Sequence, residues 1–225
     1  MAKAPIDAAR QRTLESLENH GVVRLNAEGP VPVQRTMVVV GSPRGGTSMI
    51  AAALHGLGVW MGDRLSPVYE NVPLSEAFEQ GDMVKIGRLV GQCNEQHAVW
   101  GWKRPSSADY LKRVDQALRN PRYVIVFRDL LAIGNRNHMA VGVDLIANMS
   151  ATLRHYRRIV SFLESSTAPC LLISYEKALQ DRERFVGALA KFAGLDGGAT
   201  LSAAAAKIQA SPPEYLLGAR LRQSI

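Results

Sequence analysis

Residues 41–48, which read GSPRGGTS, have the residue types and the spacing of a loop that binds phosphate. Loops of this kind in enzymes that use nucleoside triphosphates read G-x-x-x-x-G-K-[ST]. Gly41, Gly46 and Ser48 fit that pattern, whereas Thr47 occupies the position of the lysine. Glycines let the backbone approach an anion closely, and a helix that starts here would present its N–H groups and its positive end to the ligand. The segment therefore predicts an anion-binding site.

The absence of a lysine at position 47 argues against a nucleoside triphosphate as the ligand. In triphosphate enzymes this lysine contacts the β- and γ-phosphates, and the neighbouring Ser or Thr binds magnesium. The cation of the present loop is Arg44, which lies earlier in the segment. A ligand with a single bridging anhydride, bound without a required metal, fits these residues better than a triphosphate with magnesium.

Apolar runs that predict buried strands alternate with segments that predict helices. Strands are expected at residues 37–40, 122–127 and 170–173, with a shorter one at 98–103. Continuous apolar runs are typical of parallel strands that are covered on both faces. We therefore expect an α/β fold of three layers, similar to P-loop nucleotide-binding domains, with a central parallel sheet and helices on both faces. The predicted helices are residues 47–57, 74–90 with a break near Gly81, 106–119, a stretch from Asp129 interrupted at Gly134 and near Gly142, 144–165, 175–193 and 199–209.

The N-terminal part of the chain is expected to precede this domain. Residues 6–19 predict a short helix, and residues 26–36 contain two prolines and a glycine, as connectors often do. We expect a helix and connector at residues 1–36 and a single α/β domain at residues 37–225. Ligands of such domains bind at the carboxyl ends of the strands, so the predicted strand ends are where chemistry is expected.

Composition limits the setting and the partners. The 225 residues are 47% hydrophobic and include no run long and apolar enough for a transmembrane segment. The N-terminus lacks the apolar centre of a signal peptide, and Cys93 and Cys170 lack metal-site spacing, so we expect a cytoplasmic protein. The net charge of +7 favours anionic partners, but no basic–aromatic pattern predicts nucleic-acid binding.

Four segments resemble the sulfotransferases that use 3′-phosphoadenosine 5′-phosphosulfate, in particular the bacterial members. The segment SPRGGTSMIAAALHGLGVWMGD resembles their 5′-phosphosulfate loop and the helix that follows it. The other three, in the family's order, are VWGWKRP, RYVIVFRDLLAIGNRN and LLISYEKALQDRERFVGALAKFAGLD. The resemblance spans residues 37–196. It implies in-line transfer of a sulfuryl group from 3′-phosphoadenosine 5′-phosphosulfate to an acceptor hydroxyl or amine, with release of adenosine 3′,5′-bisphosphate and no required metal.

The resemblance also implies roles for individual residues. Arg44 and the N–H groups that follow it would hold the 5′-phosphate and the bridging oxygen; these N–H groups belong to Gly45, Gly46, Thr47 and Ser48. Lys103 would neutralise the transferred sulfuryl group or the acceptor side, and Arg128 would bind the 3′-phosphate through its planar guanidinium. Two positions depart from the family. Leu130 replaces the usual proline after Arg-Asp, and Arg136 stands where a serine is usual; Arg136 could bind the phosphate, block the site or shift the cofactor.

A base must take the proton of the acceptor. Glu70 matches the family's carboxylate in the loop after the first helix, and Glu76 is the second candidate. Histidines at positions 55, 97 and 138 stay open as alternatives. Several other polar and aromatic residues have structural interpretations: Asp63 stabilises its loop, Glu176 suits a helix N-terminus, and Trp100 and Trp102 pack in the core.

Two other functions remain possible from the sequence. One is a P-loop nucleotide or small-molecule kinase, against which the missing lysine speaks. The other is a sulfotransferase-like module that binds without catalysis, for which Leu130 and Arg136 give weak support. The acceptor is expected to be a small molecule or a glycan hydroxyl bound by residues 61–97 and 134–150. The sequence predicts no oligomeric state.

Overall fold

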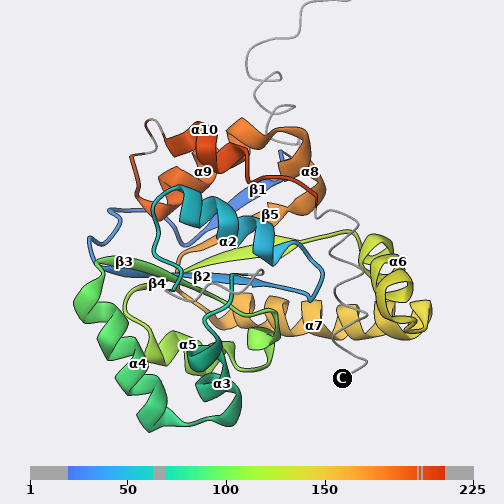
Figure 1. The fold of residues 1–225 in the computed structure, drawn as a ribbon, viewed down its shortest axis with the longest axis horizontal. Coiled ribbons are helices and arrows are strands. Elements are labelled where there is room, and N and C mark those ends of the chain that lie inside the picture. The colour runs from blue at the N-terminus through green and yellow to red at the C-terminus, as the bar shows by residue number, and fades with distance from the viewer. Residues whose placement is uncertain (1–19, 63–68, 197, 199, 211–225) are drawn as a thin grey trace, which may run out of the picture.

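A central five-stranded sheet organises the computed structural model, which describes residues 20–62, 69–196, 198 and 200–210 (Figure 1). The strand order is β1-β5-β4-β2-β3. Strand β2 runs parallel to β3 and β4, and β4 runs parallel to β5, whereas β1 pairs with β5 in the antiparallel direction. The strands are β1 (Val22–Leu25), β2 (Arg35–Gly41), β3 (Val99–Lys103), β4 (Pro121–Phe127) and β5 (Cys170–Ser174).

Helices cover both faces of the sheet because its inner strands are apolar on both sides. In β2, Met37 and Val39 pack into one core cluster, while Val38 and Val40 pack into the other. Figure 1 shows one set of helices above the sheet and another below it. The upper set is α2 (Thr47–Gly56), α8 (Tyr175–Gln180), α9 (Arg182–Ala193) and α10 (Thr200–Ala205); the lower set is α3 (Val72–Gln80), α4 (Met83–Gln96), α5 (Leu111–Ala117) and α7 (Leu145–Ser165).

The predicted fold class is confirmed, with one addition at the edge of the sheet. Strand β1 was not predicted, and it places residues 22–25, from the expected N-terminal segment, in the sheet. Its sequence VVRL is short and half exposed, so it gives no strong local signal. The sheet is therefore mostly parallel, with one antiparallel edge strand.

The predicted interruption at Gly134 is wrong. Helix α6 (Leu130–Val141) runs through Gly134 and ends at Gly142, which has a φ of 70°. A Cβ atom at Gly134 would lie 2.9 Å from Leu145 Cδ1 and 3.0 Å from Met149 Cγ on α7. Glycine at this position thus lets α6 and α7 pack closely, and it does not break the helix.

Three other predicted helices are divided or shortened. The stretch 106–119 forms a 3₁₀ turn at Pro105–Asp109 and then α5. The stretch 175–193 divides into α8 and α9 at Asp181, whose carboxylate caps α9 by accepting a bond from the N–H of Arg184 at 3.1 Å. Helix α10 ends at Ala205. Gly81, at a φ of 70°, separates α3 from α4 near the predicted break.

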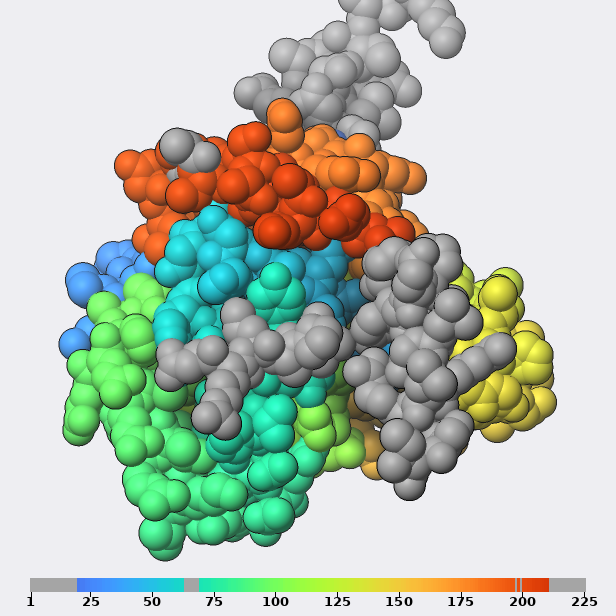
Figure 2. Space-filling view, in the orientation of Figure 1, coloured from blue at the N-terminus to red at the C-terminus, as the bar shows by residue number. Residues whose placement is uncertain are grey.

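The upper layer is closely packed where α10 contacts α2. A Cβ atom at Gly56 would lie 3.0 Å from Ala204 Cα, so the two helices approach closely there. Figure 2 shows the orange-red segment of α10 directly next to the cyan segment of α2, above it in the view. Within the described ranges, the helices are all too short or too polar to cross a membrane. The expected helix at residues 6–19, the loop residue Asp63 and the last fifteen residues of the chain, 211–225, lie outside the described residues.

Candidate active site at the carboxyl edge of the sheet

The glycines of the predicted phosphate loop are required by close packing. Gly46 precedes α2 with a φ of 96°, and a Cβ atom there would lie 2.2 Å from Cδ2 of Tyr175. The N–H of Gly45 donates to the carbonyl of Ser42 at 2.8 Å, and a Cβ atom on Gly45 would lie 2.7 Å from that same oxygen. Arg44 also has a positive φ, 63°, which is uncommon for a residue with a side chain. The loop is a tight turn with no room for a side chain at Gly45 or Gly46.

The N-terminus of α2 is arranged for an anion. The first N–H groups of a helix have no partner within the helix, and side chains often cap them. In the described part of the chain, no side chain caps the N-terminus of α2. Thr47 is buried and Ser48 is partly buried at this end. The partial positive charge of the helix end therefore remains available to a ligand.

Arg128 lies beside the loop, as the position of its strand predicts. It follows β4, the parallel neighbour of β2, and its Nη1 donates to the carbonyl of Arg44 at 2.9 Å. Its guanidinium lies over the ring of Tyr175, 4.3 Å from the ring centroid. Its Nε atom is buried and has no hydrogen-bond partner among the described residues. A buried guanidinium nitrogen without a partner is costly, and an anionic ligand would satisfy it.

The departure at Leu130 leaves the turn after Arg128 intact. Asp129 caps α6 by accepting a bond from the N–H of Ala132 at 2.7 Å, and Glu176 accepts a bond from the N–H of Asp129 at 3.0 Å. Leu130 is the first residue of α6, where proline is common because the N–H has no helical partner. Leucine at this position therefore still allows the helix to begin there.

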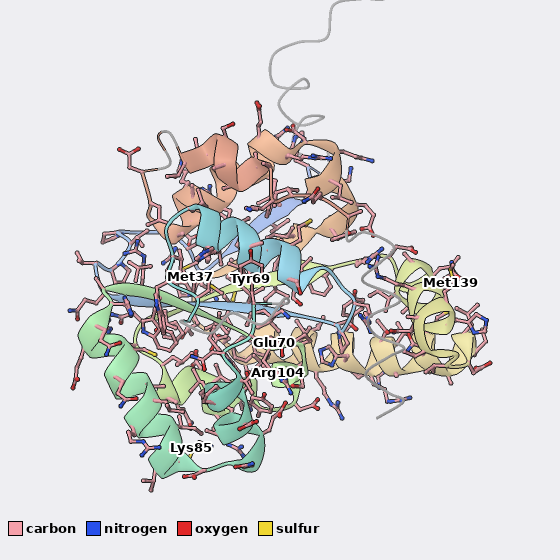
Figure 3. The ribbon with its side chains drawn as sticks, in the orientation of Figure 1. Met37, Tyr69, Glu70, Lys85, Arg104 and Met139 are labelled. Atoms are coloured by element: carbon pink, nitrogen blue, oxygen red, sulfur yellow. The ribbon has the colours of Figure 1, made fainter. Side chains whose placement is uncertain are left out.

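Glu70 and Lys103 form a buried ion pair. Lys103 Nζ lies 2.7 Å from Glu70 Oε1, and the side chains are 2% and 13% exposed, respectively. The other carboxylate oxygen of Glu70 accepts a bond from Arg104 Nη1, and Arg104 also pairs with Glu79 at 2.8 Å. Figure 3 shows Glu70 and Arg104 next to each other. The structure thus unites two predicted site residues and adds a second cation.

The ion pair controls protonation at this point of the site. Burial favours the neutral form of Glu70, but the attraction of Lys103 and hydrogen bonds from Lys103 and Arg104 outweigh it and lower the pKa of the Glu70 carboxyl. Burial lowers the pKa of Lys103, against the attraction of Glu70. Glu70 is therefore a carboxylate at neutral pH.

Adjacent strands bring the ion pair and the phosphate loop to one edge of the sheet. Lys103 is the last residue of β3 and pairs in register with Val39 of β2, two residues before Gly41. His155 of α7 lies below this edge, with Nε2 3.2 Å from the carbonyl oxygen of Gly41. The loop and the Glu70–Lys103 pair thus lie at the ends of neighbouring strands.

The other candidate bases lie elsewhere. Glu76 is exposed on α3, and His55 is exposed near the end of α2, 5.8 Å from the ring of Tyr69 between centroids. His97 precedes β3 and stacks on Trp60, so it lies at the opposite edge of the sheet from the loop. His138 is exposed on α6, where its Nδ1 lies 3.0 Å from the carbonyl of Val143.

Trp100 and Trp102 lie in the core, and Arg136 lies on α6. Trp100 and Trp102 are fully buried, and their indole N–H groups donate to Asn94 and to Ser75. They are core residues, as expected. Arg136 lies partly buried on α6, two turns after its first residue.

Three residues of the site have no motif in the sequence. His155 and Tyr156 come from the middle of α7, and Arg104 follows Lys103. Tyr156 and Arg104 bind predicted site residues, and His155 binds the backbone at the start of the loop. Only the amphipathic pattern of α7 and the basic pair at 103–104 were visible in the sequence, and neither indicates these contacts.

Three solved structures with a similar fold are sulfotransferases or sulfotransferase domains. No family model and no curated protein matches the sequence. The sulfotransferase domain of the Synechococcus PCC 7002 olefin synthase is 16% identical, with a TM-score of 0.56 and coverage of 86% of each chain. The sulfotransferase domain of the curacin biosynthetic pathway is 17% identical, with a TM-score of 0.57 and coverage of 82% of this chain and 86% of that one.

A third structure, the sulfotransferase STF1 of Mycobacterium tuberculosis H37Rv, is 13% identical. It has a TM-score of 0.51, with coverage of 93% of this chain and 80% of that one. At these identities the likeness concerns the fold. The chain has the fold of sulfotransferase domains, in agreement with the resemblance of its motifs.

Proposed function

We propose that this protein is a sulfotransferase that uses 3′-phosphoadenosine 5′-phosphosulfate. The observation that carries the proposal is the pairing of an uncapped helix N-terminus with an adjacent arginine that has a buried, unsatisfied nitrogen. Together they offer two anion sites side by side, linked by the bond from Arg128 to the carbonyl of Arg44. A nucleotide with phosphate groups at both its 5′ and 3′ positions requires such a pair.

The residues of the loop suit the 5′ end of that nucleotide. The N–H groups of Gly46, Thr47 and Ser48 would bind the 5′-phosphate, as the resemblance implies, and Arg44 would add a cation. The N–H of Gly45, which the resemblance also assigns to the phosphate, instead donates to the carbonyl of Ser42 and closes the turn. Arg128 would bind the 3′-phosphate, and Arg136 would add charge there from α6. When bound, the nucleotide supplies a sulfuryl group on a phosphosulfate anhydride, and the positive end of α2 would stabilise the charge that develops on the leaving phosphate.

Glu70 and Lys103 would act on the acceptor side. The acceptor oxygen would bond to sulfur as the bond from sulfur to the bridging oxygen breaks, and that bond's electrons would leave with adenosine 3′,5′-bisphosphate. Glu70 would take the hydroxyl proton, and Lys103 would neutralise the oxygens of the transferred group. The lowered pKa keeps Glu70 ionised at neutral pH, and its carboxylate would take the proton as the acceptor oxygen bonds to sulfur and the hydroxyl becomes acidic. Little covalent chemistry is needed, so positioning and charge neutralisation supply most of the rate.

Transfer of a labelled sulfuryl group tests the proposal. The full chain is incubated with ³⁵S-labelled 3′-phosphoadenosine 5′-phosphosulfate, with EDTA present, and with pooled small hydroxylated compounds and glycans. The proposal expects labelled acceptor and stoichiometric adenosine 3′,5′-bisphosphate. Transfer of phosphate from ATP with magnesium, without sulfuryl transfer, would instead support the kinase alternative.

A further inference from the structure

A polar cavity lies directly beside the phosphate loop. It has a volume of about 260 Å³ and is bounded by the loop, α6 and α7. Its lining residues from α7 recur at helical spacing, so one side of that helix forms most of the wall. Those that matter for its chemistry are Ser42, Pro43, Asn137, Asn148, Arg154 and Arg158.

The cavity adjoins the phosphate loop of the proposed active site. His155, which also lines it, is 8% exposed and contacts the carbonyl of Gly41 at the start of the loop. Arg158 pairs with Asp109 at 2.5 Å, and Asp109 ends the 3₁₀ turn that follows Lys103 and Arg104. A molecule in the cavity would therefore lie next to the phosphate loop and near the turn at Pro105–Asp109.

None of the residues assigned to the nucleotide lines the cavity, although one of them, Arg136, also lies on α6. Arg128 and Gly46 contact Tyr175 of α8, which belongs to the upper layer of helices. The cavity is lined by α6 and by α7, which belongs to the lower layer. The loop thus separates an area that faces Tyr175 from an area that faces His155.

The lining would bind hydroxyl groups and an anion. Asn137 Nδ2 donates to Asn148 Oδ1 at 2.9 Å, and the remaining amide atoms, Asn137 Oδ1 and Asn148 Nδ2, have no bond to other described residues. They offer one acceptor and one donor to a ligand. Arg158 is paired with Asp109, whereas no carboxylate among the described residues pairs with Arg154. The described lining includes two arginines and no carboxylate.

We propose that this cavity binds the acceptor, and that the acceptor is a small polyhydroxylated molecule that carries an anionic group, such as a sugar phosphate or a uronic acid. The inference rests on the proposed sulfotransferase function. The volume of about 260 Å³ lies just below the range of about 300–1,000 Å³ for drug-sized ligands, which favours a ligand as small as a single sugar unit. Arg154 binds the anionic group, and the Asn137–Asn148 pair orients the hydroxyls so that one of them faces the loop.

Matched pairs of acceptors test the inference. The full chain is assayed for sulfuryl transfer to glucose 6-phosphate and galacturonate, and to their neutral counterparts glucose and galactose. We expect transfer to at least one anionic member and a preference over its neutral counterpart of about tenfold or more, the effect of one favourable charge contact. Transfer only to neutral members, or to none while adenosine 3′,5′-bisphosphate still binds, would overturn the inference. Failure to bind the bisphosphate would count against the proposed function itself.

Variants on one helix separate the cavity from general charge effects. Arg154→Glu is expected to raise KM for the anionic acceptor by about tenfold or more, since attraction becomes repulsion, without changing affinity for adenosine 3′,5′-bisphosphate. Asn148→Asp adds charge at the amide pair and should act in the same direction. The control is Arg157→Glu, which makes the same charge change at an exposed position on α7 outside this cavity. Equal effects of Arg154→Glu and Arg157→Glu would overturn the assignment of the cavity.

Discussion

The hydroxyl of Tyr156 binds the backbone of Arg128 twice. It accepts a bond from the N–H of Arg128 at 2.9 Å and donates one to the carbonyl of the same residue at 2.8 Å. Arg128 in turn donates to the carbonyl of Arg44 in the phosphate loop. A tyrosine of α7 thus fixes the end of β4 and, through it, the position of the arginine proposed to bind the 3′-phosphate.

Replacement of this tyrosine tests its positioning role. In Tyr156→Phe both backbone groups of Arg128 lose a partner, and each partly buried group costs about 1–3 kcal/mol when unsatisfied. We expect lower stability and an affinity for adenosine 3′,5′-bisphosphate weaker by about tenfold, measured by calorimetry. The matched control is Tyr123→Phe, which removes a hydroxyl bonded to Asp115 at 3.0 Å near the other end of β4. An equal loss of affinity in both variants would contradict the role of Tyr156.

Gly46 is predicted to be irreplaceable for two reasons that can be separated. A Cβ atom there meets the ring of Tyr175 at 2.2 Å, and the φ of 96° is unfavourable for any side chain. Gly58 has a similar φ, 92°, with no atom within 4 Å of a Cβ, so Gly58→Ala measures the backbone cost alone. We expect Gly58→Ala to lose about 1–2 kcal/mol in urea denaturation and Gly46→Ala to lose more, together with binding of the bisphosphate. If Gly46→Ala and Gly58→Ala lose the same stability and both still bind the bisphosphate, the ring of Tyr175 moves aside and the loop tolerates a side chain.

Glu70 is predicted to affect turnover and not nucleotide binding. Glu70→Gln keeps the shape of the side chain but removes the proton acceptor, and we expect turnover to fall by roughly 10²–10⁴-fold with the affinity for the bisphosphate unchanged. Glu76→Gln is the control, because Glu76 is exposed on the following helix. If Glu76→Gln loses turnover and Glu70→Gln retains it, the roles of the two carboxylates must be exchanged.

His155 is predicted to make stability depend on pH near neutrality. Burial lowers its pKa from the ordinary value of 6.5, and backbone hydrogen bonds to Gly41 and Pro105 oppose the shift only in part. The unfolded chain therefore binds a proton at this position before the folded protein does, so stability falls as the pH decreases from about 6.5 toward the lower folded pKa.

The variant His155→Gln removes this titration while keeping a side chain that can donate to Gly41. Urea denaturation at pH 7.5 and pH 5.5 should show a smaller loss of stability on acidification in the variant than in the original chain. The other histidines are common to both proteins, so their contributions cancel. A loss of the same size in both proteins would mean that His155 titrates alike in the folded and unfolded chains.

The sequence predicts those parts of the site whose signal lies within a short segment of the chain. The glycines and hydroxyls of the loop, the strand before it and the helix after it all carry local signals, and Arg128 and Lys103 follow recognisable strands. Contacts between distant segments carry no such signal. Arg104 meets Glu70 across 34 positions, His155 meets Gly41 across 114, and the short strand β1 becomes visible only when β5 is beside it. The sequence also does not distinguish Gly134, which lets two helices pack closely, from a glycine that breaks a helix.

The central claim is that the site binds the nucleotide of sulfotransferases. Calorimetric titration with adenosine 3′,5′-bisphosphate in the absence of magnesium tests this claim most directly, and a parallel titration with ATP and magnesium serves as the comparison. The sulfotransferase account predicts micromolar binding of the bisphosphate and none of ATP. It also predicts that Arg128→Ala weakens binding of the bisphosphate by about 2–4 kcal/mol, as expected for the loss of a desolvated charge partner. The control variant Arg24→Ala, at an exposed position on β1, is expected to bind the bisphosphate as the original chain does. Binding of ATP with magnesium and not of the bisphosphate, or equal affinities in Arg128→Ala and the original chain, would contradict the account.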